Sequence, residues 1–185
     1  MKIFKTIFIT FIFLTCTVKA DLDQNFIKEF EQGGKLIFIR HAYAPGSGDP
    51  KNFNLNDCST QRNLNDSGRE QSKNIGNLFS RYNVKIDNVY TSEWCRCKET
   101  ASIAFEKFET KKFLNSFYST QFAKNRKKQI KDFKDFLEKW NKKDNFIFVT
   151  HYVVISEILN YPPSSGEVII VDKNLNIVDT LEIEY

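Results

Sequence analysis

The chain of 185 residues is long enough for one domain of ordinary size, but too short for two full ones. Its 41% hydrophobic and 27% charged residues, with only 7 glycines and 4 prolines, exclude a wholly disordered chain and collagen-like or low-complexity classes. The formal net charge of +4 falls to +1 without residues 1–20, which hold three lysines and no acid. The sequence therefore offers no large basic surface for nucleic acid.

The first twenty residues have the pattern of a secretory signal peptide. Lys2 and Lys5 precede an apolar stretch over residues 7–14, and small side chains stand near its end where a signal peptidase cleaves. The alternative, a membrane anchor, needs an apolar helix of about 20 residues, which this stretch does not supply. We predict that residues 1–20 are cleaved. Residues 21–185 would then form a single domain, exported to the bacterial periplasm or secreted, without stable membrane insertion.

The cysteines are interpreted in the light of this export. Cys16 leaves with the signal, and Cys58, Cys95 and Cys97 remain in an oxidising compartment. One disulfide from Cys58 to either Cys95 or Cys97 is predicted; the spacing does not choose between them, and one thiol is left over. Zinc is the weaker alternative, because Cys-x-Cys is not the usual zinc-knuckle spacing and no histidine is near.

From residue 35 onward, short apolar runs alternate with longer amphipathic stretches. The predicted strands cover residues 35–40, 88–92, 112–114, 146–150, 168–171 and 177–183, and the predicted helices cover residues 66–82, 94–108, 126–142 and 152–160. The first four strands resemble a buried parallel sheet, because their apolar character is continuous. The pattern predicts an α/β fold, a three-layer sandwich with a mostly parallel central sheet flanked by helices and an antiparallel C-terminal hairpin.

Two regions need separate interpretation. Residues 42–65 form a long loop directly after the first strand, and loops of that length inside a compact domain are usually functional. The predicted helix over residues 126–142 carries many lysines, but Asp132, Asp135 and Glu138 are interleaved with them. This mixture favours a solvated charged face over the alternative, a surface that binds nucleic acid or anionic lipid.

The only two histidines occupy matching positions. His41 and His151 each follow an apolar strand directly, Arg40 precedes His41, and Arg96 lies just beyond the strand over residues 88–92. Ligands of open parallel sheets bind outside the carboxyl ends of the strands, so we expect all four side chains at one edge. Two guanidiniums at that edge suit a dianion such as a phosphate ester, although each arginine alone could equally be a surface salt-bridge partner.

Four stretches resemble, in order and spacing, the motifs of the histidine phosphatase (phosphoglycerate mutase-like) superfamily. Arg40-His41-Ala42 resembles its Arg-His-Gly signature, with alanine in place of glycine. Residues 64–71 resemble its Leu-Thr-x-x-Gly-x-x-Gln stretch, residues 91–101 its Ser-x-x-x-Arg-Ala-x-x-Thr-Ala segment, and residues 149–155 the strand and helix around the second histidine. The resemblance covers residues 35 to about 171.

This resemblance implies a covalent phosphatase mechanism. His41 would attack phosphorus to give a phosphohistidine that water then hydrolyses, while Arg40, Arg96 and His151 would surround the transferred phosphoryl oxygens. No metal and no cofactor is expected, because the arginines fill the electrostatic role of a cation. The substrate would be a small or envelope-associated phosphate monoester. Two alternatives remain open, a catalytically inactive phosphate-ester-binding protein and a phosphomutase.

The sequence departs from the family at the proton donor. No carboxylate lies in residues 113–118, where mutase-like members carry a glutamate, and Tyr152 replaces the aspartate that follows the second histidine in the acid branch. The donor therefore stays unassigned, with Glu93 and Glu167 as candidates ahead of Asp57 and Glu157. A good leaving group, a water molecule or an acid from the long loop would complete the site.

Substrate contacts are expected from two segments beside the predicted site. Arg62 lies at the end of the long loop, and Asn115 and Ser116 follow the third predicted strand. If Phe113 and Phe117 point into the core, the polar residues next to them face the sheet edge. The sequence makes no prediction of oligomeric state.

Overall fold

The computed structural model describes residues 24–185, so the predicted signal peptide and Cys16 lie outside the described residues. The helices are α1 (Gln24–Glu31), α2 (Asp66–Arg81), α3 (Cys95–Phe105), α4 (Thr120–Ala123), α5 (Arg126–Glu138) and α6 (Tyr152–Leu159). The strands are β1 (Leu36–Arg40), β2 (Asn88–Thr91), β3 (Glu109–Thr110), β4 (Phe146–Thr150), β5 (Val168–Val171) and β6 (Ile177–Leu181). Two 3₁₀ turns, η1 (Cys58–Thr60) and η2 (Lys112–Leu114), complete the elements.

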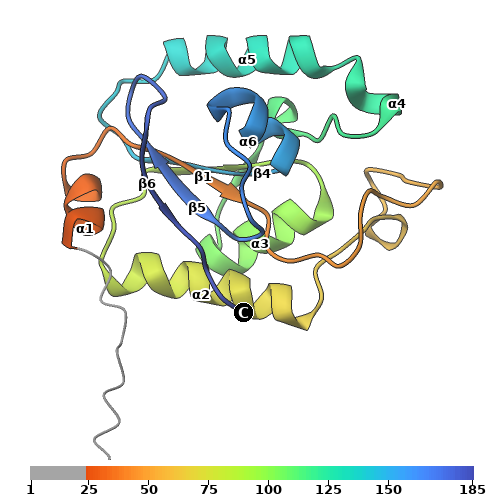
Figure 1. Cartoon of the computed structure of the whole chain (residues 1–185), viewed down its shortest axis with the longest axis horizontal. Helices are drawn as coiled ribbons and strands as arrows, with labels where there is room; N and C mark the ends of the chain where they lie inside the picture. Colours follow the sequence, from red (N-terminus) through yellow and green to blue (C-terminus); the bar gives the residue numbers. More distant parts are fainter. Residues whose placement is uncertain (1–23) are drawn as a thin grey trace, which may run out of the picture.

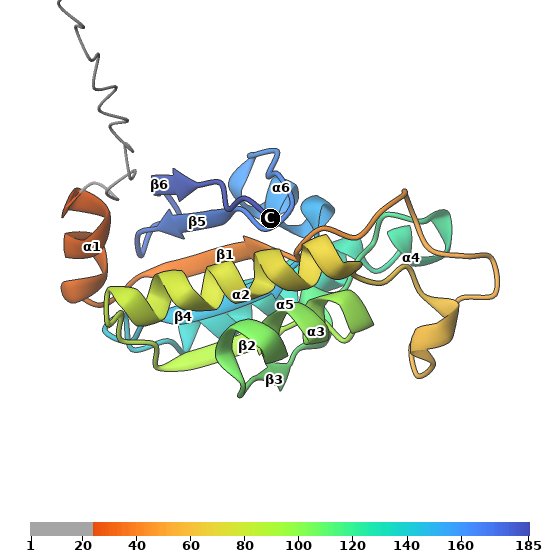
Figure 2. The same ribbon diagram turned by 90° about the horizontal axis from the view of Figure 1, so that it is seen from below.

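The six strands form one sheet in the order β3-β2-β4-β1-β5-β6 (Figures 1 and 2, with all six labelled in Figure 2). The pairs from β3 through β1 are parallel, whereas β5 pairs antiparallel with both β1 and β6. In the central pair, Leu36 lies opposite Phe146 and Arg40 opposite Thr150, which brings both carboxyl ends to the same level. The prediction of an α/β fold with a mostly parallel sheet and a C-terminal antiparallel hairpin is confirmed.

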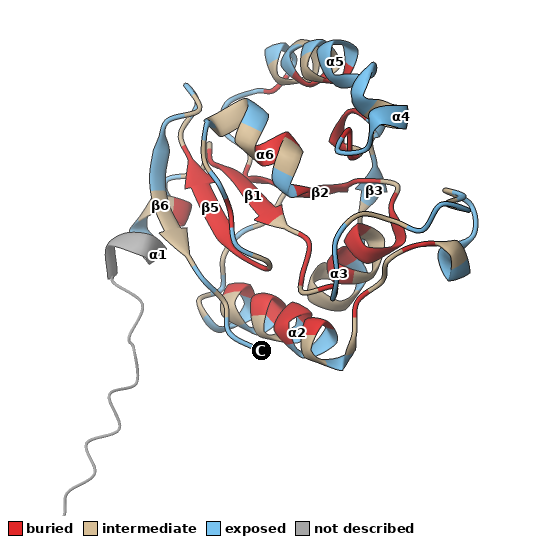
Figure 3. Ribbon diagram, turned by 45° about the vertical axis from the view of Figure 1, so that its right-hand side comes forward, coloured by how far each residue is buried: buried red, intermediate tan, exposed pale blue. Residues whose placement is uncertain are grey.

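Helices cover both faces of the sheet (Figures 1 and 2). Because side chains alternate along a strand, Ile37 and Ile39 of β1 pack toward α2 and α3, while Leu36 and Phe38 pack toward α5 and α6. All four of these side chains are fully buried, and β1 and β5 appear as the buried centre of the molecule in Figure 3. Each face thus encloses its own hydrophobic core. Among the described residues, no helix is long and apolar enough to cross a membrane.

The third predicted strand is wrong. Residues 112–114 form the 3₁₀ turn η2, and the edge strand β3 lies just before it at Glu109–Thr110. The adjacent Phe113 and Leu114 are both buried in the core beside α5, which requires a turn, since neighbouring residues of a strand face opposite sides. The short helices α1 and α4 were not predicted, and α3 and α5 end at Phe105 and Glu138, before their predicted ends.

The first turn of α2 lies against the chain that follows β1. A Cβ added at Gly68 would lie 2.0 Å from the carbonyl oxygen of Tyr43, so only glycine allows this close approach. One turn later, Gln71 accepts a hydrogen bond from the Tyr43 amide at 2.8 Å and donates to the Ser165 carbonyl at 2.8 Å. These two residues hold the backbone just beyond His41 in place.

The long loop over residues 42–65 is tied to α3. Cys58 of η1 forms a disulfide with Cys95, the first residue of α3, while Cys97 is a free, buried thiol. The amide of Cys95 also donates to Gln61 at 2.9 Å. The structure thus selects one of the two pairings that the sequence left open, and it anchors the loop next to Arg96.

Candidate active site

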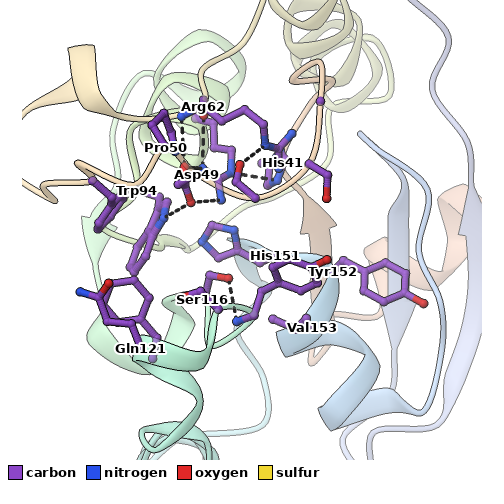
Figure 4. Close-up of a pocket in the computed structure, with 18 of the residues that line it drawn as sticks. His41, Asp49, Pro50, Arg62, Trp94, Ser116, Gln121, His151, Tyr152 and Val153 are labelled. Carbon is purple, nitrogen blue, oxygen red and sulfur yellow. Dashed lines mark hydrogen bonds and ion pairs between the residues drawn. The ribbon is translucent and has the colours of Figure 1, made fainter.

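The carboxyl ends of β1, β2 and β4 surround a cavity of about 430 Å³ (Figure 4). Arg40 ends β1 and His41 follows it, His151 follows β4, and Arg96 lies in the first turn of α3 after β2. All four line the cavity, together with the loop around Asp49 and the segment that leads into α4. The side chains that the sequence placed at one sheet edge are brought together there.

His41 is a buried, neutral imidazole of defined tautomer. Its Nδ1 lies 2.8 Å from the carbonyl oxygen of Ala42, which only accepts, so Nδ1 carries the hydrogen. The other ring nitrogen, Nε2, accepts from Nε of Arg96 at 3.1 Å. Burial first, and then the charge of Arg96, lowers the pKa of His41 well below its usual value. Thr100 fixes the backbone, because its hydroxyl accepts from the Ala42 amide at 3.1 Å.

Arg96 connects His41 to an aspartate that the sequence analysis missed. Nη1 of Arg96 donates to Asp49 Oδ1 at 2.8 Å and to the Arg62 carbonyl at 3.2 Å, while Nη2 lies 3.3 Å from Asp49 Oδ2. Trp94 Nε1 and the Arg62 amide also donate to the Asp49 carboxylate. Burial alone would raise the pKa of Asp49, but the hydrogen bonds and charge of Arg96 outweigh it and leave the pKa below its usual value.

Two further arginines add positive charge to the cavity. Arg40 donates from Nη1 to the Pro163 carbonyl at 2.9 Å, and its guanidinium lies 5.5 Å from the ring centre of Tyr152. Its Nε is buried without a hydrogen-bond partner among the described residues. Arg62 donates to the carbonyls of Gly48 and Ala44. Burial lowers the pKa of both arginines, so an oxyanion that accepts from them would offset a desolvation cost.

His151 faces His41 across the cavity, with 5.5 Å between the ring centres. Its Nε2 lies 2.8 Å from the hydroxyl oxygen of Ser92 and 3.5 Å from the sulfur of Cys97. Burial, followed by the charge of Arg96, lowers the pKa of His151 well below its usual value, and burial raises the pKa of Cys97 to about 12. Both groups are therefore neutral near pH 7. Neither contact of His151 was predicted.

The predicted substrate contacts divide into two groups. Arg62 and Ser116 line the cavity, whereas Asn115 does not. The Asn115 amide donates to Glu93 at 2.6 Å, and its oxygen accepts from the Ser92 hydroxyl at 3.1 Å. Asn115 thus braces the end of β2, because its amide completes hydrogen bonds on both sides.

The candidate proton donors lie outside the cavity. Glu93 accepts from Asn115, and Glu167 is buried, where it accepts from the Tyr161 hydroxyl and the Ser164 amide. Asp57 caps η1 and Glu157 pairs with Arg126. Asp49 is instead the carboxylate that lines the cavity among residues 24–185. Within the same residues, no group of three His, Cys, Asp or Glu side chains could hold a metal ion.

Asp49 gave only a weak signal in the sequence. It stands between Gly48 and Pro50, and both Gly46 and Gly48 adopt positive φ angles of 87° and 69°. Such residues mark a tight turn, and they say nothing of what the acid contacts. Its partner Arg96 lies 47 positions along the chain, so the contact arises only from the path of the loop.

Three arginines and two neutral histidines thus lie together at the carboxyl edge of an α/β sheet, an arrangement whose charge and donors suit a phosphoryl group. The sequence model of the histidine phosphatase superfamily (branch 1) matches residues 36–142, more than half of the chain, and the protein belongs to this family. A comparison with curated proteins finds no match.

Several solved structures share the fold. TTHB049 from Thermus thermophilus is 13% identical, with a TM-score of 0.59 over 80% of this chain and 99% of that one. The protein histidine phosphatase SixA, solved with tungstate, is 13% identical, with a TM-score of 0.52 over 81% of this chain and 96% of that one. A candidate alpha-ribazole-5'-P phosphatase from Escherichia coli is 15% identical, with a TM-score of 0.57 over 83% of this chain and 97% of that one.

Proposed function

We propose that the protein hydrolyses phosphate monoesters through a phosphohistidine on His41, without a metal ion. The observation that carries this proposal is the state of His41. Its Nδ1–H is committed to the Ala42 carbonyl, so the lone pair of Nε2 is directed toward Arg96 at the cavity. Nucleophilic attack on phosphorus requires a neutral imidazole with a fixed tautomer and an unprotonated Nε2, whose lone pair exchanges the hydrogen bond from Arg96 for the bond to phosphorus.

The reaction has two steps. In the first, Nε2 of His41 forms a bond to phosphorus while the bond from phosphorus to the ester oxygen breaks, and the leaving oxygen takes up a proton. In the second, water adds to phosphorus, the bond to Nε2 breaks, and inorganic phosphate is released. Arg40, Arg96 and His151 stabilise the charge on the phosphoryl oxygens, and the unpartnered Nε of Arg40 is a donor ready for one of them. These arginines supply the electrostatic role that a metal ion would otherwise fill.

The proposed substrate is a small or envelope-associated phosphate ester that the enzyme meets after export. Export rests on the signal-like pattern of residues 1–20. The cavity of about 430 Å³ suits a small ester. Tyr118 and Tyr152 line it with side chains that are 64% and 43% exposed, and they offer aromatic surface to the rest of the substrate.

Steady-state hydrolysis of nitrophenyl phosphate tests the proposal. The protein that begins at Asp21 should turn over in the presence of a chelator, and His41→Ala should lower kcat/KM by at least about 1000-fold. Lys131→Ala, on the exposed face of α5, serves as the control and should match the wild type. Mass spectrometry of the protein quenched in base should find phosphate on His41 during turnover.

Three outcomes would overturn the proposal. Wild-type activity in His41→Ala would exclude the nucleophile. Phosphate binding without any turnover would indicate an inactive phosphate-ester-binding protein, and transfer of the phosphoryl group to a second hydroxyl instead of water would indicate a phosphomutase.

A further inference from the structure

Asp49 is held at the active site from three sides. Arg96 donates hydrogen bonds to its carboxylate from both Nη atoms. Trp94 Nε1 donates to the same carboxylate at 3.1 Å, and the Arg62 amide donates to it at 3.0 Å. The same Arg96 donates from Nε to the attacking nitrogen of His41. One guanidinium group thus separates the nucleophile from the carboxylate, and Figure 4 shows Asp49 beside Trp94 and Arg62 in the cavity.

A phosphoryl group at His41 competes with Asp49 for Arg96. Both hydrogens of Nη1 are already taken, one by Asp49 and one by the Arg62 carbonyl, and Asp49 also faces Nη2. An oxyanion that binds Arg96 beside His41 therefore weakens the hydrogen bonds and the ion pair between Arg96 and Asp49. The carboxylate then loses part of its counter-ion and gains a negative neighbour, and each change favours its protonated form.

We propose that Asp49 is the general acid that donates a proton to the leaving oxygen, which rests on the function proposed above. A substrate that enters as the monoanion brings the proton, which passes to the Asp49 carboxylate as the dianion settles on the arginines. When Nε2 of His41 bonds to phosphorus, the ester bond breaks and the Asp49 proton moves to the departing oxygen. In the second step, the Asp49 carboxylate takes a proton from the attacking water as the bond to Nε2 breaks. It then returns that proton to the departing phosphate, which leaves as the monoanion, so that Asp49 is again a carboxylate and His41 again a neutral imidazole.

The loop keeps this acid near the reacting atoms. Arg62 donates from Nε to the Gly48 carbonyl at 2.9 Å, and the disulfide from Cys58 to Cys95 ties the far end of the loop beside Arg96. The other acids near the edge of the sheet, Glu93 and Glu167, are bound to neighbouring groups outside the cavity. Asp49 alone among them lines the cavity.

The test is the dependence of the rate on the leaving group. A good leaving group departs without a proton, whereas a poor one needs the acid. The loss of kcat/KM in Asp49→Asn should therefore be small on dinitrophenyl phosphate and should grow to about 100-fold or more on phenyl phosphate. Asp49→Glu keeps a carboxyl group and should retain the weak leaving-group dependence of the wild type. Asp57→Asn, in the same loop but outside the cavity, is the matched control.

Each result separates this proposal from the function on which it rests. A loss in Asp49→Asn that is equal on all esters would overturn the proposal and show that Asp49 only orients Arg96. A uniform gain would also overturn it and show that the carboxylate merely blocks the site. If the wild type does not hydrolyse even dinitrophenyl phosphate, the proposed function itself fails. Circular dichroism and tungstate binding of each variant confirm that it is folded.

Discussion

At His41 the backbone determines the tautomer of the imidazole ring. The Ala42 carbonyl accepts from Nδ1 and the Ala42 amide donates to Thr100, which in turn donates to the Arg96 carbonyl. A family signature that has glycine at this position is satisfied here by alanine because both contacts use main-chain atoms. The Ala42 methyl group is fully buried in a small cluster with Ala44 and Leu64.

The two buried histidines should make stability depend on pH. In the unfolded chain each has a pKa near 6.5, and in the folded protein burial lowers the pKa of both His41 and His151 well below that value. As the pH falls through about 6.5, both histidines bind protons in the unfolded chain but stay neutral in the folded protein. The free energy of unfolding therefore decreases. We expect a decrease of up to about 1.4 kcal/mol per pH unit for each histidine, measured by urea unfolding between pH 7.5 and 5.5.

A variant isolates this effect from the other titrating groups. His151→Gln removes one of the two histidines and should reduce the slope of stability against pH by about half, whatever it does to stability at pH 7. A slope in the wild type that is flat from pH 7.5 to 5.5 would contradict the prediction.

The loop over residues 42–65 is largely irregular, yet it supplies several side chains of the cavity. It supplies Asp49 and Arg62, and its fixed points are the ion pair of Asp49 with Arg96 and the disulfide to Cys95. The helix α3 therefore carries both the Arg96 guanidinium of the cavity and the anchor of the loop. Loop and helix form one unit, because displacing either would separate Asp49 from Arg96.

Removal of the disulfide should weaken this unit. The double variant Cys58→Ala/Cys95→Ala should lose about 2–4 kcal/mol of unfolding free energy, because the bond closes a long stretch of chain. Its activity should also fall, since Asp49 and Arg62 are held less firmly. Urea unfolding with and without reductant measures the loss. Reductant should destabilise the wild type and leave the variant unchanged, and three free thiols per oxidised mature chain would contradict the pairing.

At the scale of the whole molecule, one sheet joins two hydrophobic cores. Phe38 belongs to the core beneath α5 and α6, and Ile75 belongs to the core beneath α2 and α3, and both are fully buried. The strands that separate the cores are common to both. Loss of packing on one face therefore exposes the other face, and the domain should unfold in a single transition.

Truncations on the two faces test this coupling. Phe38→Ala should cost about 3–5 kcal/mol and Ile75→Ala about 2–5 kcal/mol, each in one urea transition with an unchanged slope. Val178→Ala, on the exposed part of β6, should change stability little. Far-ultraviolet and near-ultraviolet circular dichroism should report the same midpoint for every variant. Two separate transitions would show that the cores are independent.

The exposed face of α5 carries paired opposite charges. Lys128 pairs with Asp132 and Lys131 with Asp135, one turn apart on the exposed face. Opposite charges interspersed in this way favour a solvated surface.

The sequence by itself determined the alternation of strands and helices, and it predicted that Arg40, His41, Arg96 and His151 lie at one edge of the sheet, where all four line the cavity. Each of these residues lies directly at a strand end or in the next helical turn, so local apolar runs and the rule of the carboxyl edge were sufficient. The prediction of the third strand failed because the adjacent Phe113 and Leu114 both pack into the core beside α5. The local sequence pattern does not predict this packing.

Only the tertiary structure decided which cysteine Cys58 binds, that Asn115 braces β2, and that Asp49 is the acid in the cavity. These facts depend on how an irregular loop crosses the sheet edge. Its path is set by the disulfide and by hydrogen bonds between residues far apart in the chain, and periodicity carries no information about such contacts.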